Sequence, residues 1–168
     1  MRSQSVTLTG GAATFDNQNI GTNKPMTGTD FGLGGAHAGN YTLGSVATTT
    51  ADITARTVTG SFTVANKVYD ATNTATILTR TITPANLVGS DDVTLTGGAA
   101  IFDNQNIGTN KPVTGTGFGL GGADAGNYTL GNVATTTANI TAKTVTGSFT
   151  AANKVYDGTN TATILTRT

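Results

Sequence analysis

The sequence predicts an all-β protein made of tandem antiparallel β-sandwich repeats that together form a rod. The first observation behind this prediction is an internal repeat: Tyr69 and Tyr156 lie 87 positions apart (156 − 69 = 87), and the same offset relates Phe15 to Phe102. The second is composition, because Thr and Gly supply 38 and 23 of the 168 residues. Thr favours pleated strands and Gly favours turns and bulges. The third is short segments in which apolar and polar residues alternate.

The repeat sets the size of the structural unit. Of the 81 residue pairs that the offset aligns (168 − 87 = 81), 13 differ. Solenoid coils repeat at roughly 20–50 residues, so a period of 87 is too long for a solenoid. It is long enough for a small domain with its own core. The sequence therefore predicts near-identical domains in series.

Taken in chain order, the elements of one repeat are short strands separated by turns. Alternation is clear in residues 57–64, where Val58, Phe62 and Val64 share a face with Gly60. The further predicted strands are 74–80, 92–96 with Val93 and Leu95 inward, 98–103, 127–131 with Tyr128 and Leu130 inward, and 137–142 with Ala138, Ile140 and Ala142 inward. Residues 103–106 and 123–127 are turns by residue type. Roughly seven short strands per repeat are typical of a β-sandwich.

The inward phase of the pattern changes where one repeat meets the next. Inward residues are odd-numbered up to Ala55 and even-numbered from Val58 onward. A one-residue slip exchanges the two faces of a strand, so we expect a bulge or a crossing between domains there. No Pro-rich or Gly/Ser-rich spacer intervenes, which predicts a stiff joint. The expected organisation is a partial repeat at 1–56 without its leading strands, a complete repeat at 57–143, and the leading strands of a further repeat at 144–168.

Composition argues against several classes of function. Charged residues make up 11% of the chain and the net charge is zero, so the basic footprint of a nucleic-acid-binding protein is absent. No apolar run reaches the roughly 18 residues of a membrane span. Cysteine is absent, which rules out disulfides. The first ten residues lack the apolar core of a signal peptide, so we expect a mature or excised segment, or export directed by sequence not present here.

The residues themselves resemble a known repeat. The segments "KVYDGTNTAT", "GSDDVTLTGGAAIFDNQNIGTNKPVTGTGFGLGGADAGNYTL" and "TTTANITAKTVTG" occur in this order. Together they resemble the YDG-type repeat of large bacterial surface adhesins and haemagglutinin-like proteins, which occurs alongside bacterial Ig-like modules. The resemblance implies Ig-like sandwiches at the cell surface or outside the cell, and it implies no catalytic residues. Ala71 departs from the motif, which has Gly there as at Gly158; a positive φ would place about 1 kcal/mol of strain on Ala71.

Candidate sites are few, and the sequence indicates neither an enzyme nor a cofactor. Asp91, Asp92 and Asp124, near Asp103, are weak calcium candidates, because Ca²⁺ prefers several carboxylate and carbonyl oxygens near a turn. Their spacing is not a dense ligand pattern, and the first repeat has Gln4 and Ser5 at two of the positions. Solvated turn charges are therefore the favoured interpretation.

Three other features have similarly plain interpretations. His37 lacks a ligand or base cluster, so we expect a surface turn residue. The glycines of 117–122 do not open a helix, which argues against a phosphate loop. Lys67 and Lys154 are candidates for isopeptide bonds with Asn or Asp, with ordinary surface lysines as the favoured interpretation.

The expected function is structural: a stalk or fibre segment whose partners are neighbouring repeats. A second possibility is that identical chains join head to tail by strand complementation. The alternative to such joining is that these 168 residues are a window on a longer continuous array of repeats. A glycan- or protein-binding adhesive module, using sandwich-end loops with Asn127 and Tyr128, is the alternative function. Ice binding through rows of Thr is not favoured, because it needs a flat Thr surface built from a repeat much shorter than 87 residues. The sequence names no receptor.

Overall fold

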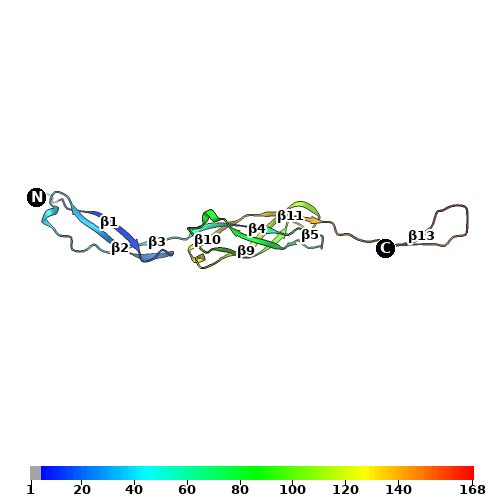
Figure 1. Ribbon diagram of the computed structural model, residues 1–168, viewed down its shortest axis with the longest axis horizontal. Coiled ribbons are helices and arrows are strands. Elements are labelled where there is room, and N and C mark those ends of the chain that lie inside the picture. The colour runs from blue at the N-terminus through cyan, green and yellow to red at the C-terminus, as the bar shows by residue number, and fades with distance from the viewer. Residues whose placement is uncertain (1–4) are drawn as a thin grey trace.

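The computed structural model describes residues 5–168 as thirteen β-strands and three 3₁₀ helices of one turn each (Figure 1). The described residues contain no helix long and apolar enough to cross a membrane. The all-β prediction is confirmed, and it follows from the abundance of β-branched Thr and turn-forming Gly.

The middle of the chain forms two sheets that pack face to face. The three-stranded sheet has the order β10-β4-β7, and the five-stranded sheet has the order β5-β11-β9-β8-β6. The bounds are β4 Arg56–Val64, β5 Lys67–Val68, β6 Thr74–Ala75, β7 Ile77–Ile82, β8 Thr94–Phe102, β9 Gly108–Gly121, β10 Tyr128–Val133 and β11 Thr136–Thr141. Helix η2 (Pro84–Asn86) lies between β7 and β8, and η3 (Ala125–Asn127) lies between β9 and β10. The arrangement is a β-sandwich, as predicted.

Strand β4 runs through the whole sandwich and contributes to both halves of its core. Its burial alternates strictly, with Val58, Gly60, Phe62 and Val64 buried as the sequence pattern predicts. The ring of Phe62 packs 5.2 Å from that of Phe118, measured between centroids.

The core has two clusters, one at each end of β4. One contains Phe62, Val64, Ala100, Phe102, Val113, Ala138 and Ile140. The other contains Val58, Ile82, Val93, Leu95 and Tyr128. Phe118 packs partly buried against both clusters and so connects them.

The hairpin β8–β9 changes its inward phase where the two clusters meet. The segments 92–96 and 98–103, predicted as two strands, largely form the single strand β8. Inward residues pass from Leu95 to Ala100, although the pairing register with β9 is unbroken. Gly97 and Gly98 in β8, and Gly117 in β9, have positive φ values of 65°, 87° and 71°. These glycines let both strands rotate together, which the period-two rule alone does not anticipate.

Two details of the sequence prediction need correction. The pairs β10·β4 and β11·β5 are parallel, so the sandwich is not purely antiparallel. Ala142 is exposed, because β11 ends at Thr141 before the chain leaves the sheet. Alternation defines the faces of a strand but carries no information on the direction of its neighbour.

The segments before and after the middle sandwich form smaller pieces of the same pattern. Strands β1 (Thr7–Phe15), β2 (Gly21–Gly34) and β3 (Thr49–Ile53) form one sheet, with η1 (Ala38–Asn40) between β2 and β3. We call this sheet the head. Strands β12 (Phe149–Ala151) and β13 (Ile164–Arg167) form a hairpin that we call the tail. Figure 1 shows the head beyond one end of the sandwich and the tail beyond the other.

The predicted phase slip near residue 56 marks a real crossing between sheets. Strand β3 belongs to the head sheet and β4 to the sandwich, with only Thr54 and Ala55 between them. The sequence boundaries at 56 and 143 remain predictions about folding units, since sheet membership alone does not show independent folding.

Candidate functional site: the joint between repeats

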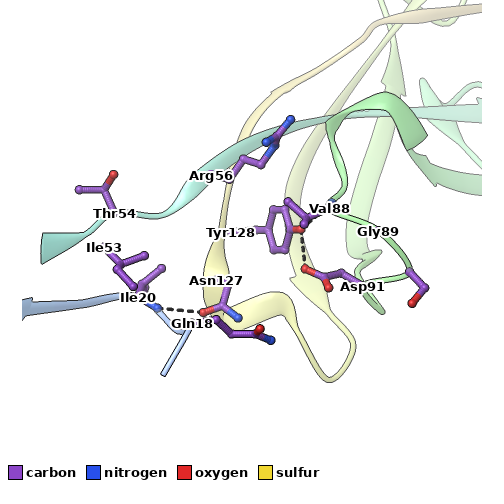
Figure 2. Close-up of a pocket in the computed structure, with 11 residues that line it drawn as sticks. Gln18, Ile20, Ile53, Thr54, Arg56, Val88, Gly89, Asp91, Asn127 and Tyr128 are labelled. Atoms are coloured by element: carbon purple, nitrogen blue, oxygen red, sulfur yellow. Dashed lines mark hydrogen bonds between the residues drawn. The ribbon is translucent and has the colours of Figure 1, made fainter. Parts of the chain in front are cut away.

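The head meets the sandwich through Asn127, the last residue of η3. The Ile20 backbone N–H donates a hydrogen bond to Asn127 Oδ1 at 3.1 Å, and Asn127 Nδ2 donates to Asn19 Oδ1 at 3.2 Å. Figure 2 shows Ile20 and Asn127 facing each other across the joint. Because Asn19 and Ile20 lie in the turn between β1 and β2, these bonds fix that turn against the sandwich end.

Tyr128, the neighbour of Asn127, anchors the sandwich side of the joint. Its hydroxyl donates to Asp91 Oδ2 at 2.6 Å and accepts the Val88 N–H at 2.9 Å (Figure 2). The hydrogen bond to the Asp91 carboxylate, together with burial, raises the pKa of Tyr128 above its usual value. The side chain is 7% exposed, so it stabilises the loop before β8 from inside.

A cavity of about 410 Å³ lies between the two parts at this joint. Gln18, Ile20 and Ile53 line it from the head. Arg56 and Asp91 line it from the sandwich, but Arg56 Nε donates to the Asn86 carbonyl at 2.8 Å. The polar groups of the joint thus hold loops in place, and no nucleophile–base pair is among them.

The opposite end of the sandwich carries the residues that, in the head, form the head's side of the joint. Asn106, Ile107 and Lys143 are the repeat equivalents of Asn19, Ile20 and Arg56, and they line a second cavity of about 620 Å³ with Tyr69 and Val145. Ile107 is exposed there. A further repeat would bring an Asn-Tyr pair to this position, as Asn127 and Tyr128 approach the head.

The head exposes a face that is buried in the sandwich. Strands β1 and β2 pair in the same register as β8 and β9, with Thr7 opposite Gly34 as Thr94 is opposite Gly121. However, Leu8 is 49% exposed whereas its equivalent Leu95 is 5% exposed. The cover that β4 and β7 give to β8 is missing from the head.

The tail exposes the residues that provide this cover. Its hairpin pairs Phe149 with Arg167 as β4 and β7 pair Phe62 with Arg80. Phe149 is 68% exposed and Phe62 is 3% exposed. The head and the tail thus expose the equivalents of two faces that pack together in the sandwich, and each has its own strands already paired.

The calcium candidates lie in two neighbouring loops, before β8 and after β9, but do not form a ligand group. The Asp92 N–H donates to Asp124 Oδ2 at 2.9 Å, and the Ala123 N–H donates to Asp92 Oδ2 at 3.1 Å. Asp91 instead accepts the Tyr128 hydroxyl. Within residues 5–168, no three His, Cys, Asp or Glu side chains gather in an arrangement that could hold a metal ion. The structure assigns these carboxylates to turn stabilisation.

His37 takes the place of Asp124 in the first repeat. Its Nδ1 accepts the Ser5 N–H at 3.3 Å, as Asp124 accepts the Asp92 N–H. The two repeats also share a backbone hydrogen bond at this position. It runs from the His37 N–H to the Ser5 carbonyl at 3.3 Å, and from the Asp124 N–H to the Asp92 carbonyl at 3.1 Å. The imidazole thus serves as an acceptor that closes a turn.

The "KVYD" segments form a local lysine-centred loop. Lys67 Nζ lies 2.7 Å from Asp70 Oδ1 and also donates to the carbonyls of Thr72 and Thr74, each at 3.1 Å. Lys154 lies equally close to Asp157, at 2.7 Å. Of the two partner types predicted for an isopeptide bond, each lysine therefore has an Asp beside it. Neither lysine donates a hydrogen bond to an Asn carboxamide within residues 5–168.

Comparison with known proteins identifies the repeat. A family model described as the YDG domain matches residues 1–51 and 54–138. No curated protein and no solved structure matches the chain. The break between the two matches falls at residues 52–53, next to the crossing from β3 to β4, so the model matches the head and the sandwich in turn. The chain belongs to the YDG domain family.

Proposed function

We propose that this chain is a structural segment of a stalk or fibre in an extracellular, adhesin-like bacterial protein. Its task is to hold a fixed distance and direction between other parts, without catalysis. The observation that carries the proposal is the joint between β3 and β4, where two connecting residues and the Asn127 hydrogen bonds link consecutive repeats.

The complementary halves support a particular mode of extension. In the sandwich, β4 and β7 cover the sheet that contains β8 and β9. The tail carries the same hairpin, and the head carries the same uncovered sheet. A tail from a neighbouring repeat or from an identical chain would bury the apolar faces of both pieces and remove their open strand edges. Such a contact is heterologous and open-ended, so identical chains would propagate as a filament.

Light scattering across a range of concentrations tests this assembly. We expect residues 1–168 to form concentration-dependent polymers and residues 1–143 to remain monomeric. If both are monomeric, complementation between chains is wrong and the chain acts only as a continuous array.

Two single substitutions separate specific docking from general stickiness. Phe149→Ser should abolish polymers, because the equivalent Phe62 is buried in the complete sandwich. Leu165→Ser should not, because Leu165 and its equivalent Leu78 are 63% and 62% exposed. Equal loss of polymers in both variants would indicate non-specific association.

Small-angle scattering of a longer array tests stiffness. We expect an elongated rod whose maximum dimension grows linearly with the number of repeats. Removing the Asn127 amide from every joint by Asn127→Ala and its equivalents should broaden the distribution of shapes. A compact particle in the parent array would overturn the proposal.

The alternative function is a glycan- or protein-binding module. The residues expected to make that contact, Asn127 and Tyr128, are engaged in the joint. Repeat-dependent binding on a glycan array would favour the alternative, and it would have to use other loop residues.

A further inference from the structure

A second lysine cluster lies in the turn between β8 and β9, apart from the "KVYD" loops. Lys111 of β9 points back to Asp103 and Asn104, which follow β8. Its Nζ lies 2.8 Å from Asp103 Oδ1 and 2.9 Å from Asn104 Oδ1. The Lys111 side chain is 9% exposed, which is rare for lysine unless its charge is paired.

The Asn104 carboxamide is held between groups that suit acyl transfer. Its Oδ1 accepts the Asn106 N–H at 3.0 Å in addition to Lys111 Nζ. Its Nδ2 donates to Asp103 Oδ2 at 3.0 Å. One oxygen of Asp103 therefore contacts the amine, and the other contacts the amide nitrogen. A backbone N–H is placed where negative charge would develop on the carbonyl oxygen.

The first repeat contains the same arrangement. Lys24 Nζ lies 2.9 Å from Asp16 Oδ1 and 2.7 Å from Asn17 Oδ1. Asn17 Nδ2 donates to Asp16 Oδ2 at 3.0 Å, and the Asn19 N–H donates to Asn17 Oδ1 at 3.0 Å. The geometry thus belongs to the repeat, and it forms in the uncovered head as well as in the sandwich.

We propose that Lys111 and Asn104, and likewise Lys24 and Asn17, join in an intramolecular amide bond with the neighbouring aspartate as proton carrier. Asp103 accepts a proton from the Lys111 ammonium, and the neutral amine attacks Cγ of Asn104. The Asp103 carboxyl then returns a proton to the departing amide nitrogen, which leaves as ammonia and takes up the remaining extra proton of the attacking nitrogen. Overall, an ammonium and a carboxamide become a secondary amide and an ammonium ion, so no oxidant or cofactor is required.

The charge state of the Lys111–Asp103 pair explains why the amide bond would form slowly after folding. The hydrogen bond from Lys111 holds the pKa of Asp103 below its usual value, so the charged pair predominates. The neutral amine forms only by proton transfer within the pair.

The other lysine loops provide an internal contrast. Lys67 and Lys154 each contact an aspartate and a threonine hydroxyl, and neither donates a hydrogen bond to a carboxamide within residues 5–168. The proposal is therefore specific to the turn "DNQN" followed by lysine.

Mass spectrometry of the full chain after prolonged incubation tests the proposal. We expect an intact mass lower than the sequence mass by one ammonia for each bond. Cleavage before aspartate releases residues 16–29 and 103–123, and each peptide should carry one such loss. Backbone fragments between residues 104 and 111 should be missing from the second peptide, because the bond closes a ring.

Two results would overturn it. The full sequence mass after incubation would show that the reaction does not occur. An ammonia loss with ordinary fragments between 104 and 111 would show a succinimide at Asn104 instead of a bond to Lys111.

Matched variants assign the roles. Lys111→Arg keeps the positive charge and should abolish the loss in the second repeat while the 16–29 peptide still reacts. Asp103→Ala keeps both reacting groups and should also abolish it, now observed in the peptide 92–123. Lys67→Arg should leave both losses unchanged; if it removes them, the assignment is wrong.

Discussion

Ala71 shows how a single residue can carry strain that its repeat equivalent avoids. Ala71 has φ of 63°, and Gly158 has φ of 72° at the same position. A Cβ at Gly158 would meet nothing within 4 Å, so crowding is not the problem at this turn. The backbone conformation alone is unfavourable for alanine.

Ala71→Gly should therefore raise the stability of the sandwich by about 1 kcal/mol, less the entropy that glycine adds to the unfolded chain. Chemical denaturation of the parent and the variant measures this. As a control, Ala75→Gly removes a methyl group in β6, where φ is not positive, and should destabilise. No gain for Ala71→Gly would mean that the turn relaxes without cost.

Asp70 makes a pH-dependent contribution at the same loop. The hydrogen bond from Lys67, then those from Thr72, lower the pKa of Asp70 from 3.8 to about 2. A lowered pKa means that the folded state favours the carboxylate. The resulting stabilisation is complete above pH 3.8 and is lost as the pH falls towards 2.

A carboxyl-carbon NMR titration should place the Asp70 midpoint near pH 2. Lys67→Gln removes the largest cause of the shift, so the midpoint should rise towards 3.8. An unchanged midpoint in that variant would show that the Thr72 hydrogen bonds dominate.

At the scale of elements, the hairpin β8–β9 depends on two glycines with different requirements. Gly98 and Gly117 both have positive φ. A Cβ at Gly98 would overlap the ring of Phe118, whereas a Cβ at Gly117 would meet nothing within 4 Å. Of these two glycines, only Gly98 is needed for both its conformation and its lack of a side chain.

Gly117→Ala should cost about 1 kcal/mol for the backbone conformation. Gly98→Ala should cost about 1–3 kcal/mol more, because the added methyl group displaces Phe118 from between the two core clusters. Thermal denaturation of both variants measures the difference. Equal losses would show that Phe118 can move without disturbing the core.

The same hairpin shows what alternation predicts and what it misses. Strand β4 alternates over its whole length, so its buried face could be predicted residue by residue. In β8 the phase changes at Gly97–Gly98, and the two halves look like separate strands. The parallel pairing of β10 with β4 leaves no trace in either pattern. The lysine turn was missed because burial of Lys111 depends on contacts across the hairpin, although the "DNQN" turn itself was predicted.

At the scale of the whole molecule, repetition supplies an internal comparison for every position. Leu8, Tyr41 and Phe149 are exposed, and their equivalents Leu95, Tyr128 and Phe62 are buried. The sequences are nearly the same, so the difference arises from neighbours and not from the residues themselves. The sequence predicts the repeat period and the incomplete copies at 1–56 and 144–168, whereas the exposure of each residue in those copies comes from the structure.

This comparison predicts unequal effects for one truncation made in two copies. Phe62→Ala removes a ring that is packed in the first core cluster and against Phe118, and should cost about 3–5 kcal/mol. Phe149→Ala removes an exposed ring and should leave the unfolding of a dilute monomer almost unchanged. Differential scanning calorimetry at low concentration measures both. Equal losses in the monomer would contradict the assignment of residues 57–143 as the complete unit. A loss for Phe149→Ala that appears only at high concentration would instead reveal the tail docked on a neighbouring head.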